Sequence, residues 1–300
     1  MLTRQDYRTL LLAALGGTLE FYDFVIFVFF AVVIGQLFFP PDTPDWMRQV
    51  QTFSIFAAGY LARPLGGMVM AHFGDLLGRK RMFMMSIFLM SVPTLAIGLL
   101  PTYAAIGIWA PLLLLVLRVL QGAAIGGEVP GAWVFVAEHV QPRHVGFACG
   151  TLTAGLTGGI LLGSLVATAV NKAYLPAEML TEGWRVPFII GGLFGLLSVW
   201  LRQWLQETPV FREMHAAQKL ADEMPLKKVV REHRIAVLLV MLMTWLLSAA
   251  IVVMILMTPT LVQKLYAISP ANALEASSIA TLFLSMGCIV FGALADRFGP

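Results

Sequence analysis

Eight long runs of apolar residues, separated by short polar segments, dominate the chain. They cover residues 10–39, 50–73, 82–100, 109–137, 146–170, 186–205, 235–262 and 277–295. A helix needs about 20 mostly apolar residues to cross the hydrocarbon core of a bilayer. The runs are continuous rather than alternating, and each is far longer than the ~10 residues of a barrel strand. The pattern therefore predicts an all-α, multi-pass membrane protein.

Composition supports this fold class. Hydrophobic residues make up 59% of the 300 positions and charged residues 12%, whereas soluble domains carry about 25% charged residues. This excludes a soluble enzyme, and a net charge of +3 is too small for a nucleic-acid-binding face. Both cysteines, Cys149 and Cys288, lie inside apolar runs, which excludes a disulfide framework. The sequence has no nucleophile beside a base, no phosphate loop and no metal-ligand spacing, so we expect no catalysis, metal or cofactor.

Lysine and arginine in the connections predict the orientation of the chain. With the N-terminus inside, cytoplasmic segments hold fourteen of these cations and outer segments only four. Cytoplasmic loops of membrane proteins are rich in Lys and Arg. We therefore expect a cytoplasmic N-terminus.

The only long polar stretch, residues 206–234, divides six apolar runs from two. The division predicts an N-terminal six-helix bundle in residues 1–205, a cytoplasmic linker, and the first two helices of a second bundle in residues 235–300. A solvated linker is the simpler interpretation of the polar stretch. The alternative is contact with anionic lipid through Lys227, Lys228, Arg231 and Arg234.

An internal repeat relates the two parts. AHFGDLLGRK at 71–80 and GALADRFGP at 292–300 each follow an apolar run and place a small residue before Asp and a Gly three residues after it. Asp75 and Asp296 are 221 residues apart, close to the spacing between the first and seventh runs. On this alignment the second half holds two helices where the first holds six. We therefore expect a truncated chain, the alternative being that another polypeptide supplies the missing helices.

Several of these motifs together resemble a known family. GDLLGRKR at 74–81 and RVLQGAAIGGE at 118–128 are similar to the loop and fourth-helix signatures of the major facilitator superfamily. The stretches that narrow the resemblance to the bacterial metabolite:proton symporters are GGTLEFYDFVIF at 16–27, YLARPLGG at 60–67, GWRVPFIIGG at 183–192 and LQETPVF at 205–211. Ala71 and Leu76 depart from the loop signature. The resemblance implies a twelve-helix carrier of the bacterial inner membrane, here truncated after the eighth helix.

Ionisable residues inside the predicted spans are the candidate functional residues, since each costs about 2.5–3.5 kcal/mol on insertion scales. Glu20 and Asp23 are three apart and share a helix face. Mutual repulsion and burial favour a proton on one of them, which suits a proton-coupling role. Arg63 is expected at the same depth, where it either neutralises them or binds a substrate carboxylate. A static buried ion-pair cluster is the alternative interpretation.

Two further polar positions lie on the fourth span. Arg118 and Gln121 share a face and are candidates for substrate binding or charge balance. The resemblance implies that Arg118 takes part in coupling or in substrate charge balance; a structural hydrogen bond to backbone carbonyls of a neighbouring helix is the alternative. Depth counting puts Arg118 nearer the outer side than Arg63. Glu128 is either a partner for Arg63 or a helix-end hydrogen-bonder, and its role stays open. The aromatic run at 24–30 is interpreted as lipid-facing or packing residues.

The polar turn between the second and third spans is the candidate cytoplasmic gate. Its charged residues are Asp75, Arg79 and Lys80, and the resemblance implies that the Asp–Arg pair closes the gate by ion pairing and by capping a helix in the opposite half. Ordinary anchoring of cations on the cytoplasmic side is the alternative for Lys80. Asp296 and Arg297 are the counterparts of these charged residues, and we expect Asp296 near the start of the fifth span. Glycines four apart, Gly155, Gly159 and Gly163 with Gly122 and Gly126, predict close helix packing.

These features predict a secondary active transporter. It would move a small polar metabolite, an organic acid or a zwitterionic osmolyte, together with protons by alternating access. Its partners would be the metabolite, protons and the lipid bilayer, and not nucleic acid. The alternative is a non-transporting remnant, or a membrane scaffold or sensor derived from such a carrier.

Overall fold

The structure, a computed structural model, describes residues 4–77, 79–202 and 231–299. Side chains are not described at residues 5, 71, 72, 74–77, 79–83, 127, 128, 201 and 202. Every regular element in these ranges is a helix. This confirms the predicted all-α, multi-pass class, while most of the predicted linker lies outside the described residues.

Helices of the first part follow the apolar runs in order. They are α1 (Arg4–Phe29), α2 (Ala31–Phe38), α3 (Asp45–Leu77), α4 (Arg79–Leu99), α5 (Tyr103–Ile106), α6 (Trp109–His139), η1 (Pro142–His144), α7 (Val145–Ala173), α8 (Pro176–Glu178), η2 (Met179–Gly183) and α9 (Arg185–Arg202). After the gap come α12 (Arg234–Ile251), η3 (Val252–Met257), α13 (Thr258–Tyr266) and α14 (Pro270–Phe298).

The eight predicted spans all have counterparts among these helices. Six described helices are long and apolar enough to cross a membrane, and a seventh span arises if the bent pair Pro176–Gly183 and Arg185–Trp200 counts as one. The remaining prediction, residues 82–100, corresponds to the shorter apolar helix Met84–Leu99.

Two helix boundaries differ from the predicted ones because of the local backbone conformation or a capping hydrogen bond. The first span bends at Phe30, whose backbone angles of φ −102° and ψ 12° separate α1 from α2. The eighth begins at Pro270, seven residues early, because Ser269 accepts a 3.4 Å hydrogen bond from the amide of Asn272 and caps the helix. Polar capping turns are invisible to an apolar pattern, which explains this error.

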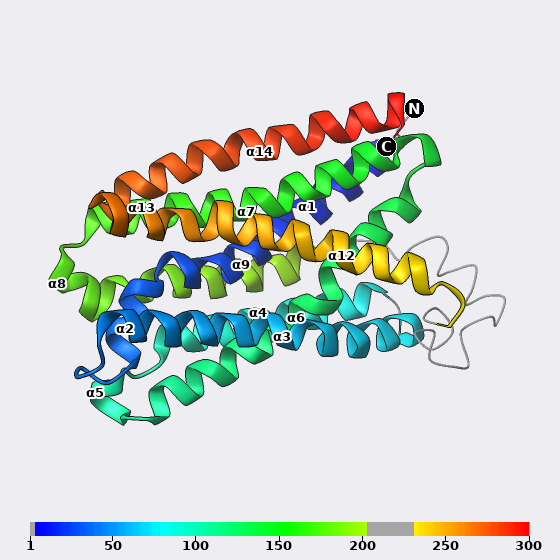
Figure 1. The fold of residues 1–300 in the computed structure, drawn as a ribbon. Coiled ribbons are helices and arrows are strands. Elements are labelled where there is room, and N and C mark those ends of the chain that lie inside the picture. Colours follow the sequence, from blue (N-terminus) through cyan, green and yellow to red (C-terminus); the bar gives the residue numbers. More distant parts are fainter. Residues whose placement is uncertain (1–3, 78, 203–230, 300) are drawn as a thin grey trace.

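The helices pack side by side, with both termini at one end of the molecule (Figure 1). α14 lies along α7, α7 lies along α1, and α3 lies along α6. The main apolar core is centred on α1, where Tyr22 and Phe24 to Val28 are almost fully buried. α1 therefore runs through the interior, so that polar side chains on it are shielded from lipid.

Glycines allow the close approaches, as the sequence predicts. A Cβ at Gly155 would lie 2.5 Å from the carbonyl oxygen of Ala14, and one at Gly163 would lie 2.9 Å from Val25 Cγ2. Between α3 and α6, a Cβ at Gly122 or Gly126 would overlap the carbonyl oxygens of Gly59 and Arg63. Both helix pairs thus pack backbone against backbone.

Adjacent glycines on α7 give a first testable prediction. Gly159→Ala should lower the free energy of unfolding by about 1–3 kcal/mol, because the new methyl group would lie 2.7 Å from Phe21 Cβ and collide with the carbonyl oxygen of Thr18. Gly158→Ala is the matched control, since its nearest neighbour would be Thr18 Oγ1 at 3.6 Å. Thermal unfolding in detergent should separate the two variants, and equal midpoints would contradict close packing at Gly159.

Candidate functional site

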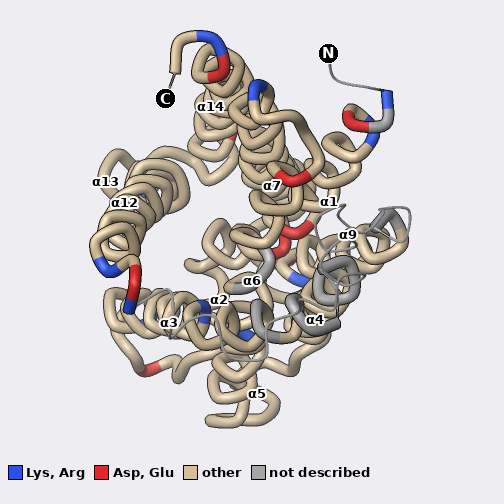
Figure 2. Tube along the Cα trace, turned by 90° about the vertical axis from the view of Figure 1, so that its right-hand side faces the viewer, with Lys and Arg blue, Asp and Glu red and all other residues tan. Residues whose placement is uncertain are grey.

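Three helices bring the predicted charged side chains together. α1 carries Glu20 and Asp23, α3 carries Arg63, and α6 carries Arg118 and Gln121. Glu20, Asp23, Arg118 and Gln121 are each at most 2% exposed. Seen along the helices, acidic and basic positions lie inside the ring of helices near α1, α6 and α3 (Figure 2). The polar cluster is therefore internal.

Glycine contacts between α3 and α6 set the two arginines close to each other. Gly59 packs against the carbonyl of Arg118, and Gly126 packs against the carbonyl of Arg63. Each arginine thus leaves its helix at a point where the two backbones touch. Larger residues at the glycine positions would separate the helices and move both guanidinium groups.

Both guanidinium groups lie close to the ring of Phe24. Its ring centroid is 4.4 Å from Cζ of Arg63 and 4.8 Å from Cζ of Arg118. Arg63 also lies 3.8 Å from the ring centroid of Tyr60, and Arg118 lies 4.3 Å from that of Phe27. Cation–π contacts of this kind stabilise a guanidinium group in a dry interior. Aromatic residues interpreted from the sequence as lipid-facing or packing therefore hold both charges.

Each arginine has buried N–H groups for which the described residues provide no hydrogen-bond acceptor. Arg118 Nη1 donates to Gln121 Oε1 at 2.8 Å. Nε and Nη2 of Arg118, and the same two atoms of Arg63, are buried and have no hydrogen-bond acceptor in the described part of the chain. Buried donors in native proteins are normally paired. The arrangement therefore suits an anionic group that binds between the arginines.

Asp23 lies against α4 and α9. Its Oδ2 lies 3.2 Å from the position of a Cβ at Gly195, and its Oδ1 closely approaches that of Gly191. Ser91 and Thr94 of α4 border the same two glycines. Neither carboxylate oxygen has a hydrogen-bond donor among the described residues. Glycines on α9 thus leave the space into which the carboxyl group fits.

Gln121 connects the arginine side of the cluster to the carboxyl side. Its Oε1 accepts from Arg118, and its Nε2 donates to Thr94 Oγ1 at 2.6 Å. Sequence analysis found Gln121 but missed Thr94, since a single hydroxyl in an apolar span carries no signal. Tyr60 was findable in principle, because it precedes Arg63 by three residues and so shares its face.

Some predicted site residues lie outside the described side chains. These are Glu128, Asp75, Arg79 and Lys80. Their roles remain predictions.

The expected contact of Asp296 is confirmed. Its Oδ1 and Oδ2 accept hydrogen bonds of 2.7 Å from the backbone amides of Gly146 and Phe147, the first residues of α7. A carboxylate at a helix N-terminus satisfies amides that lack partners within the helix and complements its dipole. Its neighbour Arg297 lies over the ring of Phe298.

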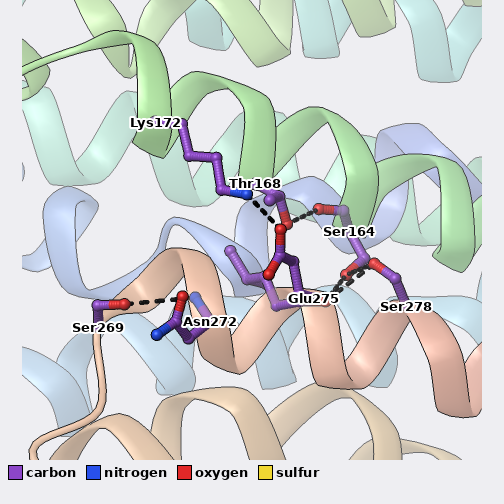
Figure 3. A network of polar contacts seen from close by, with 8 residues as sticks. Ser164, Thr168, Lys172, Ser269, Asn272, Glu275 and Ser278 are labelled. Atoms are coloured by element: carbon purple, nitrogen blue, oxygen red, sulfur yellow. Dashed lines mark hydrogen bonds and ion pairs between the residues drawn. The ribbon is translucent and has the colours of Figure 1, made fainter.

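Other polar contacts hold the opposite end of the α7–α14 pair (Figure 3). Lys172 and Glu275 form an ion pair there, with both side chains about half exposed. Deeper in, Ser164 Oγ donates to the carbonyl oxygen of Leu274 at 2.7 Å, and Ser278 Oγ lies 2.8 Å from Ser164 Oγ. The two helices are therefore joined at both ends.

Asp296 gives a second prediction. Asp296→Ala should destabilise the start of α7 by about 0.5–2 kcal/mol, the usual cost of losing an N-terminal cap. Hydrogen exchange at the amides of Gly146 and Phe147 should accelerate accordingly. Glu275→Ala at the other end is the matched control, because an exposed ion pair contributes about 0–1 kcal/mol. Unchanged exchange in Asp296→Ala would contradict the capping role.

Known proteins match the chain in both sequence and fold. A sequence profile of the Major Facilitator Superfamily matches residues 25–300. A putative proline/betaine transporter of Staphylococcus aureus is 31% identical over 97% of this chain and 63% of its own length. The proline/betaine transporter of Escherichia coli is 39% identical over 67% of this chain and 40% of its own length. The chain thus spans less than two thirds of these curated relatives.

A glycine betaine/proline/ectoine/pipecolic acid transporter of Dickeya dadantii is 40% identical over 67% of this chain and 40% of its own length. Among solved structures, a D-xylose-proton symporter superposes with a TM-score of 0.73 at 17% identity, covering 97% of this chain and 69% of its own. At that identity the likeness concerns the fold. Profile, relatives and fold agree: this chain belongs to the major facilitator superfamily.

Proposed function

We propose that this protein is a proton-coupled carrier of a small carboxylated metabolite, either a zwitterionic osmolyte or an organic acid, in the bacterial inner membrane with its N-terminus in the cytoplasm. The arginine pair beside Phe24 carries the proposal. Four buried guanidinium nitrogens without acceptors among the described residues would be left unsatisfied in a purely structural cluster. A substrate carboxylate would satisfy them.

The charge of the cluster favours an anion-bearing substrate. Guanidinium groups bind carboxylates with two parallel hydrogen bonds, and Arg63 and Arg118 present such donors from different helices. Relatives named as proline/betaine transporters point to zwitterions in which a carboxylate is the recognisable group. Proline and glycine betaine share a carboxylate next to a positively charged nitrogen.

Proton coupling is assigned to Asp23, with Glu20 as the second carboxyl group. Burying an ionised carboxylate without hydrogen-bond donors costs much free energy. The surroundings of Asp23 therefore favour its protonated form. Glu20 lies within electrostatic range of Arg63. Loss of the Asp23 proton would then add a negative charge to the cluster on its α4 and α9 side, away from the substrate carboxylate.

Alternating access would use two bundles, residues 1–205 and the part beginning at residue 235, joined through 206–234. The contact of Asp296 with α7 is proposed as part of the cytoplasmic gate, with Arg297 beside it and Asp75, Arg79 and Lys80 as the equivalent set. In this gate a carboxylate from one part caps a helix of the other. Opening the cytoplasmic side would break the cap.

A ligand pair tests the proposal directly. Glycine betaine should raise the thermal midpoint of the purified protein, whereas choline, which has an alcohol in place of the carboxylate, should not. In proteoliposomes, a proton gradient should drive labelled glycine betaine or proline uphill, and a protonophore should stop it. Binding without uptake would favour the non-transporting alternative. Equal responses to choline and betaine would overturn the carboxylate assignment.

A further inference from the structure

Thr94 stands at the junction between the carboxyl side and the arginine side of the cluster. Its side chain is fully buried. The hydroxyl donates to the carbonyl oxygen of Met90 at 2.9 Å and accepts from Gln121 Nε2 at 2.6 Å. Since a hydroxyl has a single proton, that proton is committed to Met90 in this arrangement.

Asp23 is the immediate neighbour of Thr94. A Cβ at Gly191 would lie 3.0 Å from Thr94 Cγ2 and even closer to Asp23 Oδ1, so the two side chains border the same small space. Asp23 accepts no hydrogen bond from the described residues. A donor for its ionised form must therefore be recruited from nearby, and Thr94 carries a hydroxyl beside this space that is also bonded to Gln121.

We propose that Thr94 is a positioning residue for the coupling proton, because its hydroxyl turns from Met90 to Asp23 when that carboxyl group ionises. The Asp23 proton leaves to water, and Thr94 transfers no proton of its own. Throughout the change, Thr94 Oγ1 continues to accept from Gln121. The inference depends on the proposed role of Asp23 in proton coupling.

Gln121 would transmit the change to the substrate side. Its amide is orientated, with nitrogen toward Thr94 and oxygen toward Arg118. Turning the Thr94 hydroxyl toward a negative charge polarises this chain of bonds and alters the acceptor available to Arg118. Proton and substrate sites would thus communicate without a direct ion pair.

Several other titratable groups lie on the described helices around Asp23. α1 contributes Glu20 and Tyr22, whose hydroxyl donates to the carbonyl oxygen of Pro187 at 2.9 Å. α3 and α6 contribute Arg63 and Arg118. From α4, Ser91 Oγ and Thr94 Cγ2 lie with the Asp23 carboxyl group against Gly195 and Gly191 of α9. Ser91 already donates to Ile87 at 2.7 Å and has no bond to Gln121 among the described contacts.

Thr94→Val tests the inference because it keeps the shape of the side chain and removes the hydroxyl. The readout is the infrared band of the protonated carboxyl group of Asp23 in the purified protein, identified by its loss in Asp23→Asn. At a pH where part of Asp23 is ionised, Thr94→Val should show an ionised fraction about tenfold or more smaller, since a hydrogen bond to a charged group is lost. Thr94→Ser should restore the wild-type titration.

Thr52→Val is the matched control. Thr52 is also fully buried and donates to the carbonyl oxygen four residues earlier, at Arg48, with a 2.8 Å bond, but it lies outside the cluster. Its replacement should leave the band unchanged. Thr94→Ala provides a second hydroxyl-free variant if Thr94→Val does not fold, and either variant titrating like wild type would overturn the inference.

Transport separates this inference from the proposed function. Thr94→Val should lose most proton-driven accumulation yet keep substrate exchange across the membrane, which needs no net proton release. If the wild-type protein shows no proton-driven uptake and no titrating Asp23 band, the proposed function fails. If wild type shows both and Thr94→Val matches it, only the role of Thr94 fails.

Discussion

Arg118→Met is expected to weaken binding of a carboxylated substrate strongly while leaving the fold intact or more stable. Arg118 is 1% exposed and keeps two donors without acceptors in the described chain. Replacing an incompletely paired buried charge by an apolar side chain of similar length is often neutral or stabilising by about 1–4 kcal/mol. Losing a charged partner of the carboxylate should weaken binding by about 30-fold or more, corresponding to 2–5 kcal/mol.

A structural arginine provides the matched control. Arg185 Nη1 donates to the carbonyl oxygens of Gly98 at 2.8 Å and Leu100 at 3.1 Å, where it holds the end of α4. Arg185→Met should therefore lower the thermal midpoint and leave ligand affinity close to wild type. Titration of glycine betaine by calorimetry, with thermal unfolding in parallel, separates the two patterns. A fall in stability with unchanged affinity in Arg118→Met would show that Arg118 is structural.

Asp23→Asn should lower proton-driven accumulation by about 5- to 150-fold, the range that corresponds to a typical coupling free energy between two sites. Asparagine keeps the shape that fits against Gly191 and Gly195 and mimics the neutral carboxyl group. Exchange of labelled for unlabelled substrate needs no net proton movement and should persist. The measurement is uphill uptake compared with counterflow in the same proteoliposomes.

Glu20→Gln distinguishes the two carboxyl groups. Glu20 is buried like Asp23 but lies within electrostatic range of Arg63, so its replacement should affect substrate affinity more than coupling. If Glu20→Gln alone stops uphill uptake while Asp23→Asn does not, the coupling role moves to Glu20. Loss of exchange in both variants would instead indicate a static ion-pair cluster.

Much of the fold follows from the apolar pattern, because crossing a membrane requires long continuous hydrophobic helices. Glycine spacing on α6 and α7 similarly predicts close packing, since only glycine lets two helix backbones touch. The positions of long polar side chains are harder to predict from the sequence, because such a side chain reaches far from its own backbone. Counting depth along the helix puts Arg118 nearer the outer side, yet its guanidinium group shares Phe24 with Arg63, because arginine extends several ångströms from its own Cα.

Residues whose roles depend on contacts with other helices also could not be identified from the sequence. Phe24 and Thr94 gain their roles from side chains on other helices: Arg63 and Arg118 for the first, and Gln121 for the second. Neither has a distinctive neighbour in its own segment that signals the contact. By contrast, Asp296 was predictable because the internal repeat gave it a counterpart and a helix terminus to bind.

The attachment of α14 to α7 restricts how the two helices can move. Both have 29 residues, a length of about 43 Å, and they are joined by Asp296 at one end and by Lys172 and Glu275 at the other. Sliding by even one helical turn would break both attachments and drive Gly292 out of its fit against Gly146. Rotation about a pivot between the two attachments would instead open one end at a time, which would break the Asp296 cap while the contacts near the pivot stay in place. In any large rearrangement, we therefore expect the helices to pivot about the α7–α14 pair, so that the helices farthest from it move the most.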